Sequence, residues 1–172
     1  QWYRANCRPG SDLPERMAVG RERRMTYAER ARESALRVMK ERDNCATAVL
    51  LGVAEAFGVD VPEMLVASSE FLREGMYSGC CCGALNGAIL ACGVLNGIHG
   101  HPRGTRLAAD VHDAFKKRFG ATCCRAIRAK RTLLQRIGRN ACRDLTAETA
   151  AMTAGFWEPV FDGTAVNDDE RE

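Results

Sequence analysis

Cysteine is the residue type in this sequence best suited to chemistry, because its thiolate binds metals and takes part in redox reactions. The chain has nine cysteines among 172 residues, which is many for an ordinary globular protein and few for a small disulfide-bonded scaffold. They stand at positions 7, 45, 80, 81, 82, 92, 123, 124 and 142. The function of this protein is therefore expected to involve its thiols.

Most of these cysteines lie where helices are expected to begin. They are Cys45 after the cap residue Asn44, Cys80, Cys81 and Cys82 before a Gly/Ala-rich segment, Cys123 and Cys124 after Thr122, and Cys142 ahead of the last predicted helix. A helix N-terminus has unpaired N–H groups and a partial positive charge. Both are expected to lower the pKa of a thiol and to favour the thiolate that metals and redox chemistry require.

Two cysteines fit this pattern less well. Cys92 lies inside an apolar helical segment, where a cysteine usually serves as a small buried hydrophobic residue. Cys7 lies in a polar, arginine-rich stretch without helical periodicity, and it is the least favoured functional thiol. An alternative stays open for all of the cysteines: they could be small buried hydrophobic residues without a chemical role.

The spacing of the thiols disfavours the commonest metal sites. Structural zinc sites usually contain CxxC pairs, whereas long gaps separate Cys45, Cys82, Cys124 and Cys142. Covalent haem is also disfavoured, because the chain has no CxxCH sequence. His99, His101 and His112 could complete a metal coordination shell, but His99 and His101 are expected in an exposed turn, since glycine and proline surround them. A hydrolytic Cys–His pair ranks last.

The elements that must position the thiols are helices. Apolar residues recur at helical spacing and strand patterns are nearly absent, so we expect an all-α, single-domain bundle of about six to seven helices with a central Gly/Ala-rich helix. The expected helices cover about 26–41, 44–57, 62–74, 82–96 and 105–119, a segment after Thr122 with Ile127, Leu134 and Ile137 on one side, and 145–154. The expected division is a polar arm over 1–24, a cysteine-rich helical redox domain over 25–155 and a tail over 156–172.

The local signals for these helix ends can be named. Thr26 and Glu29 form a capping-box pair, and either Asp43 or Asn44 can cap the second helix. Gly58 and Gly120 are suited to end the second and fifth helices in the left-handed conformation.

Charge and hydropathy bear on partners and location. The net charge is +3, and the segment Lys116–Arg143 has ten basic residues and no acidic one. We interpret this segment as a solvated helix face or as a docking surface for an acidic redox partner. Nucleic acid is disfavoured as a partner, because few aromatic residues interleave the basic ones.

The uncharged stretch Gly75–Ile98 contains many glycines, so we interpret it as a buried helix and not as a membrane span. This helix suits a homodimer interface equally well. Residues 1–42 lack the apolar core of a secretory signal, so a cytoplasmic protein is expected.

Four ordered motifs resemble those of a known family. They are Asn-Cys-Ala-Thr-Ala-Val-Leu around Cys45, Cys-Gly-Ala-Leu-Asn-Gly from Cys82, Cys-Cys-Arg around Cys124 and Ala-Cys-Arg-Asp-Leu around Cys142. Over about Tyr27–Met152 the chain resembles the C_GCAxxG_C_C family of redox-active proteins. The resemblance implies a small helical redox protein related to a domain of split-Soret cytochrome c that holds an iron–sulfur cluster. It supports these four cysteines as the core thiols and names no reaction.

An iron–sulfur cluster suits this set of residues. A cluster needs about four thiolates, and backbone N–H donors tune its potential. The expected ligands are Cys45, Cys82, Cys124 and Cys142, with Cys80 and Cys123 as the next candidates and Cys81 as a further metal ligand. Because the chain has more candidate cysteines than four, the type of the cluster stays open among [2Fe–2S], [4Fe–4S] and larger clusters. Electron transfer is the predicted function; a metal-free thiol–disulfide protein and a zinc-binding or interaction module with a basic face remain alternatives.

Overall fold

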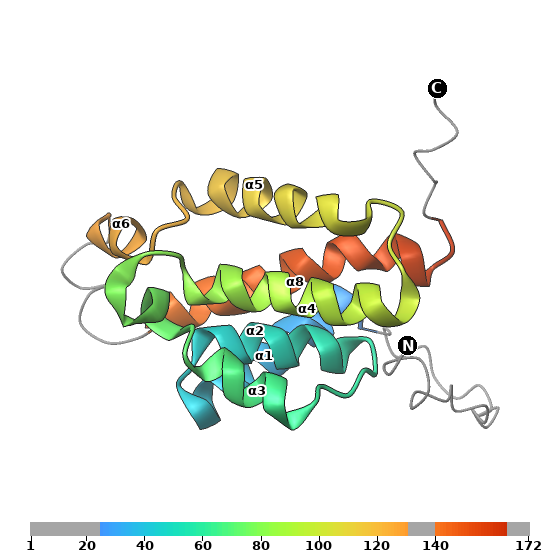
Figure 1. The fold of residues 1–172 in the computed structure, drawn as a ribbon, viewed down its shortest axis with the longest axis horizontal. Helices are drawn as coiled ribbons and strands as arrows, with labels where there is room; N and C mark the ends of the chain where they lie inside the picture. Colours follow the sequence, from blue (N-terminus) through green and yellow to red (C-terminus); the bar gives the residue numbers. More distant parts are fainter. Residues whose placement is uncertain (1–24, 131–139, 165–172) are drawn as a thin grey trace.

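The described residues, 25–130 and 140–164 of the computed structural model, form helices joined by short loops. Figure 1 shows α1 (Tyr27–Arg42), α2 (Cys45–Ala56), α3 (Glu63–Glu70), α4 (Gly83–His99), α5 (Leu107–Phe119), α6 (Cys124–Ala129) and α8 (Asn140–Phe161). Within these ranges there is no β-strand, only one isolated bridge between Cys81 and Cys123. The predicted all-α, single-domain bundle is therefore confirmed.

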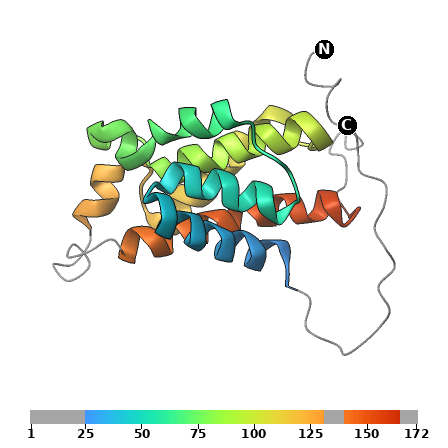
Figure 2. The same ribbon diagram turned by 90° about the horizontal axis from the view of Figure 1, so that it is seen from below.

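The core forms around α4, as its composition predicts. This helix packs against α2, α5 and α8, and α1 closes the bundle by packing on α2 and α8 (Figures 1 and 2). The largest fully buried side chains, Trp157, Phe115, Leu50 and Leu95, come from four different helices. No helix in the described part of the chain is long and apolar enough to cross a membrane.

Local sequence signals account for most helix ends. The Thr26 hydroxyl accepts a hydrogen bond from the backbone N–H of Glu29, and the Glu29 carboxylate accepts one from the backbone N–H of Thr26, which completes the predicted capping box. Asn44 rather than Asp43 caps α2, because its side-chain oxygen accepts from the N–H groups of Ala46 and Thr47. Gly120 ends α5 with a φ of 73°.

Two predicted helix boundaries are wrong. The third helix does not continue to Glu74; it ends at Glu70, and Glu74 itself has a left-handed backbone that a right-handed helix cannot include. The last helix is longer than 145–154 and begins at Asn140, so Cys142 lies in its first turn rather than ahead of it. The predicted positions Leu134, Ile137, Cys7 and the arm over 1–24 lie outside the described residues.

Glycines allow α4 to lie directly on the start of α2. A Cβ atom on Gly87 would stand 2.2 Å from the carbonyl oxygen of Ala46, and one on Gly83 would stand 2.5 Å from the Sγ of Cys45. Real Cβ atoms do not come this close to other heavy atoms. The glycines of the Cys82 motif thus bring the beginnings of two cysteine-bearing helices together.

Replacing Gly87 tests this close approach. Gly87→Ala should destabilise the protein by about 1–3 kcal/mol, because the added methyl group meets backbone that cannot move aside. The control is Gly93→Ala on the same helix, where nothing lies within 4 Å of the new Cβ; it should stabilise by about 0.5–1 kcal/mol through helix propensity alone. Urea denaturation measures both, and equal effects of the two substitutions would contradict the packing described.

Candidate functional site

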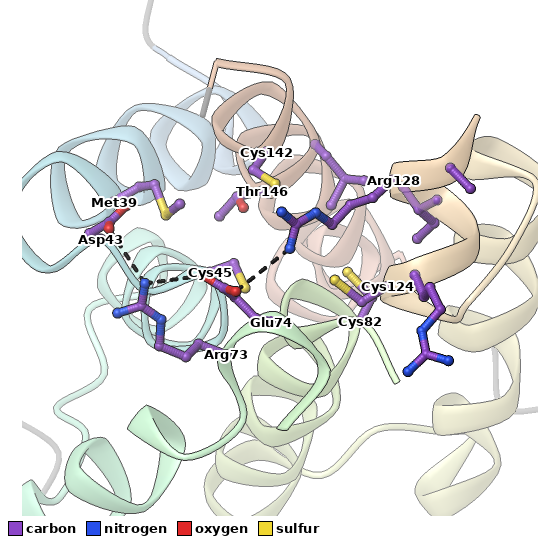
Figure 3. Close-up of a pocket in the computed structure, with 14 residues that line it drawn as sticks. Met39, Asp43, Cys45, Arg73, Glu74, Cys82, Cys124, Arg128, Cys142 and Thr146 are labelled. Carbon is purple, nitrogen blue, oxygen red and sulfur yellow. Dashed lines mark hydrogen bonds and ion pairs between the residues drawn. The ribbon is translucent and has the colours of Figure 1, made fainter. Parts of the chain in front are cut away.

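Four cysteines from four different helix starts line one cavity of about 430 Å³. They are Cys45, Cys82, Cys124 and Cys142, from α2, α4, α6 and α8. These helices all begin at the same end of the bundle, on the left of Figure 1, and Figure 3 shows the four thiols around the cavity. Folding therefore brings together residues that are far apart in the sequence.

Backbone geometry fixes where each thiol stands. Cys45 is the first residue of α2, and Cys82 is the N-cap of α4. The backbone N–H of Cys82 donates to the Thr122 carbonyl at 2.8 Å, and that of Cys124 donates to the Cys80 carbonyl at 2.7 Å. These two hydrogen bonds join the segment that leads into α4 to the segment that leads into α6.

Burial has the largest effect on the pKa values of three of the lining thiols, Cys45, Cys82 and Cys124. Burial raises the pKa of Cys82 to about 12, with a further contribution from the nearby Cys45 thiolate; the N–H groups of Ala84 and Leu85 lower it only in part. Burial is also the largest cause of the raised pKa values of Cys45 and Cys124, and repulsion from Cys142 adds to both. The N–H groups at the helix starts thus lower the pKa values of Cys45 and Cys82 as expected, but the net shift is upward, because the loss of hydration outweighs them.

A network of charged side chains lies along the cavity. Arg73 contacts the carboxylates of Asp43 and Glu74, each at 3.4 Å, and Arg128 reaches the other oxygen of Glu74 at 3.6 Å (Figure 3). Arg125 also lines the cavity. The lining residues thus include three arginines and two acidic residues, an excess of positive charge that suits an occupant with some negative charge.

Two polar groups of residues that line the cavity have no hydrogen-bond acceptor within residues 25–130 and 140–164. Thr146 is fully buried, and within the described residues its hydroxyl has no partner. The Nε–H of Arg73 is also buried without a partner in the part of the chain that the structure describes. Such groups are rare in folded proteins because each costs about 1–3 kcal/mol. Both would be satisfied by an occupant that accepts hydrogen bonds.

The loop before the cysteine run has an unusual backbone. Glu74, Gly75, Met76 and Tyr77 all have φ between 52° and 68°, and each non-glycine residue in this conformation costs about 1–2 kcal/mol. A Cβ on Gly75 would stand 2.8 Å from the backbone nitrogen of Cys80. Arg125 holds the turn from outside by donating to the Ser78 carbonyl at 2.8 Å. Strain of this kind is typical of segments fixed for a function, and here it places Glu74 at the cavity.

The other candidate thiols do not line this cavity. Cys80 is exposed, while Cys81 and Cys123 are partly exposed. The backbones of Cys81 and Cys123 pair in the isolated β-bridge, and both thiols are free. Burial raises the pKa of Cys81, and repulsion from the thiolates of Cys80 and Cys123 raises it further, so these three thiols form a second group. Cys92 is buried in the main core, as a small hydrophobic residue would be.

The described histidines and basic residues take other roles. His99 packs on the ring of Phe161, the Nε2 of His101 lies 3.1 Å from the Phe156 carbonyl, and His112 contacts Asp113. None of the three is among the residues that line the cavity.

The basic side chains on α5, on α6 and directly after α6 are exposed. They are Lys116, Lys117, Arg118, Arg125, Arg128 and Lys130.

The described residues contain no group of three or more His, Cys, Asp or Glu side chains placed to hold one metal ion. The four thiols instead surround a cavity whose volume lies in the range of small-molecule and cofactor sites.

Comparison with known proteins identifies the family. A family model described as "Putative redox-active protein (C_GCAxxG_C_C)" matches residues 43–156, about two-thirds of the chain. The protein belongs to the C_GCAxxG_C_C family. The match includes all four cysteines of the cavity, and the redox character of the family agrees with a site built from thiols. Neither a curated protein nor a solved structure matches the chain.

Sequence analysis of this C_GCAxxG_C_C protein missed several residues of the cavity. Thr146 follows Cys142 by four positions and Arg128 follows Cys124 by four, so helical spacing could have placed both beside a candidate thiol. No comparable signal identifies Arg73 or Glu74, because they reach the cavity through the left-handed turn.

Alkylation rates test the contrast between Cys80 and Cys92. Burial raises the pKa of Cys92 to about 11, so its thiolate fraction at pH 8 is on the order of 10⁻³. In folded protein, iodoacetamide should modify exposed Cys80 much faster than Cys92, and the rate at Cys92 should rise as the pH is raised toward 11. Mass spectrometry of fragmented peptides measures both rates. In urea the two should become similar; equal rates in the folded protein would contradict the described burial.

Proposed function

We propose that this protein is an electron carrier that binds an iron–sulfur cluster through Cys45, Cys82, Cys124 and Cys142. The observation that supports the proposal most strongly is the convergence of these four thiols on one cavity from four helices. The description of the family as redox-active supports the same class of function. When bound, the cluster would supply reversible one-electron chemistry.

The donor set of the cavity fits such a group. Four thiolates are the usual ligands of [2Fe–2S] and [4Fe–4S] clusters. Neighbouring thiolates repel one another, which is why, in addition to burial, neighbouring thiols raise the pKa values of Cys45, Cys82 and Cys124. Bound as thiolates to iron, Cys45, Cys82, Cys124 and Cys142 would no longer bear this repulsion, because the positive charge of the metal would offset theirs.

The residues around the thiols would hold and tune the cluster. The Thr146 hydroxyl and the Nε–H of Arg73 are donors without acceptors within the described residues. The N–H groups of Ala84 and Leu85 lie close enough to the Cys82 sulfur to favour its thiolate. Hydrogen bonds to sulfur and nearby positive charge both raise a cluster's potential.

The exposed basic side chains of α5 and α6 are the proposed docking surface for an acidic redox partner. Arg125 and Arg128 both line the cavity and are exposed, so the surface is continuous with the site. Complementary charge speeds association and makes it sensitive to salt. Electron transfer with such a partner should therefore slow as ionic strength rises.

Anaerobic purification tests the proposal. The full chain should be brown and contain iron and acid-labile sulfide. Cys82→Ser should lose colour, iron and sulfide, since serine removes one of four ligands. Cys80→Ser is the matched control, two residues away and exposed, and should keep all three.

Other results would contradict the proposal in identifiable ways. A colourless protein that reversibly loses two of the cavity thiols on oxidation would favour the metal-free thiol–disulfide function instead. Stoichiometric zinc without iron would favour the zinc-binding module. Retention of colour and iron in Cys82→Ser would overturn the ligand assignment.

Thr146→Val tests the role of the unpartnered hydroxyl. Valine has nearly the same shape, so the variant should make the metal-free protein more stable by about 1 kcal/mol, because a buried hydroxyl without an acceptor is removed. The midpoint potential of the loaded protein should become more negative, since a donor to the cluster is lost. Urea denaturation and potentiometric titration measure the two effects; an unchanged potential would mean that Thr146 does not contact the cluster.

A further inference from the structure

The second group of thiols lies where two short extended segments pair. The hydrogen bonds from Cys82 to Thr122 and from Cys124 to Cys80 flank one residue on each segment, Cys81 and Cys123. This is the pattern of a non-hydrogen-bonded antiparallel pair, in which the two Cα atoms are about 4.5 Å apart and the side chains are on the same face. Disulfides are found at Cα separations from about 4.4 Å upward, so this backbone accepts a bond between the two sulfur atoms.

The pairing also separates these thiols from the cavity. Side chains alternate between the two faces of an extended segment. Accordingly, Cys82 and Cys124 line the cavity, whereas Cys81 and Cys123 do not and are partly exposed. The Cys123 thiol lies beside the Gly79 carbonyl, to which it donates at 3.1 Å. A disulfide substrate can therefore approach this pair without entering the cavity.

We propose that Cys81 and Cys123 form a second redox site, a dithiol that reduces disulfides. One of the two thiolates attacks a sulfur atom of the incoming disulfide and releases its first thiol. The other then attacks the mixed disulfide and releases the second thiol. The substrate disulfide gains two electrons and two protons, and Cys81 and Cys123 become joined by an S–S bond.

The bond would link the two segments that also bear Cys82 and Cys124. Because two hydrogen bonds already hold the segments in register, closing the bond requires no change in pairing. The inference does not require a cluster, since neither sulfur of the pair lines the cavity.

Peptide mapping tests this site. The reduced full-length protein is treated anaerobically with oxidised glutathione, then blocked with an alkylating reagent and digested with trypsin. Cleavage at arginine leaves Cys81 in the peptide 74–103 and Cys123 in the peptide 119–125. We expect these two peptides to be joined in a monomeric protein, with fragmentation locating the bond, and to separate after treatment with dithiothreitol.

Variants assign the bond to its residues. Cys81→Ser and Cys123→Ser should each lose the joined peptide, and Cys80→Ser should keep it. Persistence of the joined peptide in Cys81→Ser, or its absence from the wild-type protein, would overturn the inference. Iron analysis of the same samples separates the two proposals: a protein without iron that forms the bond supports this site alone, and a brown protein without the bond supports the cluster alone.

Discussion

The pairing of residues 80–82 with residues 122–124 is the constraint on which the rest of the site depends. Two backbone hydrogen bonds hold these segments antiparallel, directly before α4 and α6. The alternation of side chains along the pair places Cys82 and Cys124 in the cavity and Cys81 and Cys123 outside it. One structural feature thus divides a crowded group of cysteines into two sites with different surroundings.

The cavity also shows a competition between burial and the helix field. The N–H groups at the start of α4 favour the Cys82 thiolate, yet burial makes the neutral thiol strongly preferred. Buried thiols, and two donors that have no acceptor within the described residues, make this cavity a poorly satisfied environment. A metal–sulfide group would offset these costs, which supports the proposed cofactor over a simple packing role for the same residues.

Periodicity and capping predicted the fold well, because they act within one helix. The capping box at Thr26, the left-handed Gly120 and the central helix with Cys92 in the core all agree with the structure. The four cavity cysteines were predicted from their positions at helix starts and from the family motifs, since each signal is local. The turn at Glu74–Tyr77 was not predicted, because contacts with Cys80 and Arg125 hold it in a conformation that its own residues disfavour.

In the proposed site, four cysteine sulfurs from distant parts of the chain bind one iron–sulfur group. Iron K-edge X-ray absorption of the anaerobically prepared protein observes this coordination. We expect sulfur atoms as the nearest neighbours of iron and a distinct iron–iron distance. Iron surrounded by nitrogen and oxygen with no neighbouring iron, or a protein prepared under these conditions without iron, would contradict the proposed coordination.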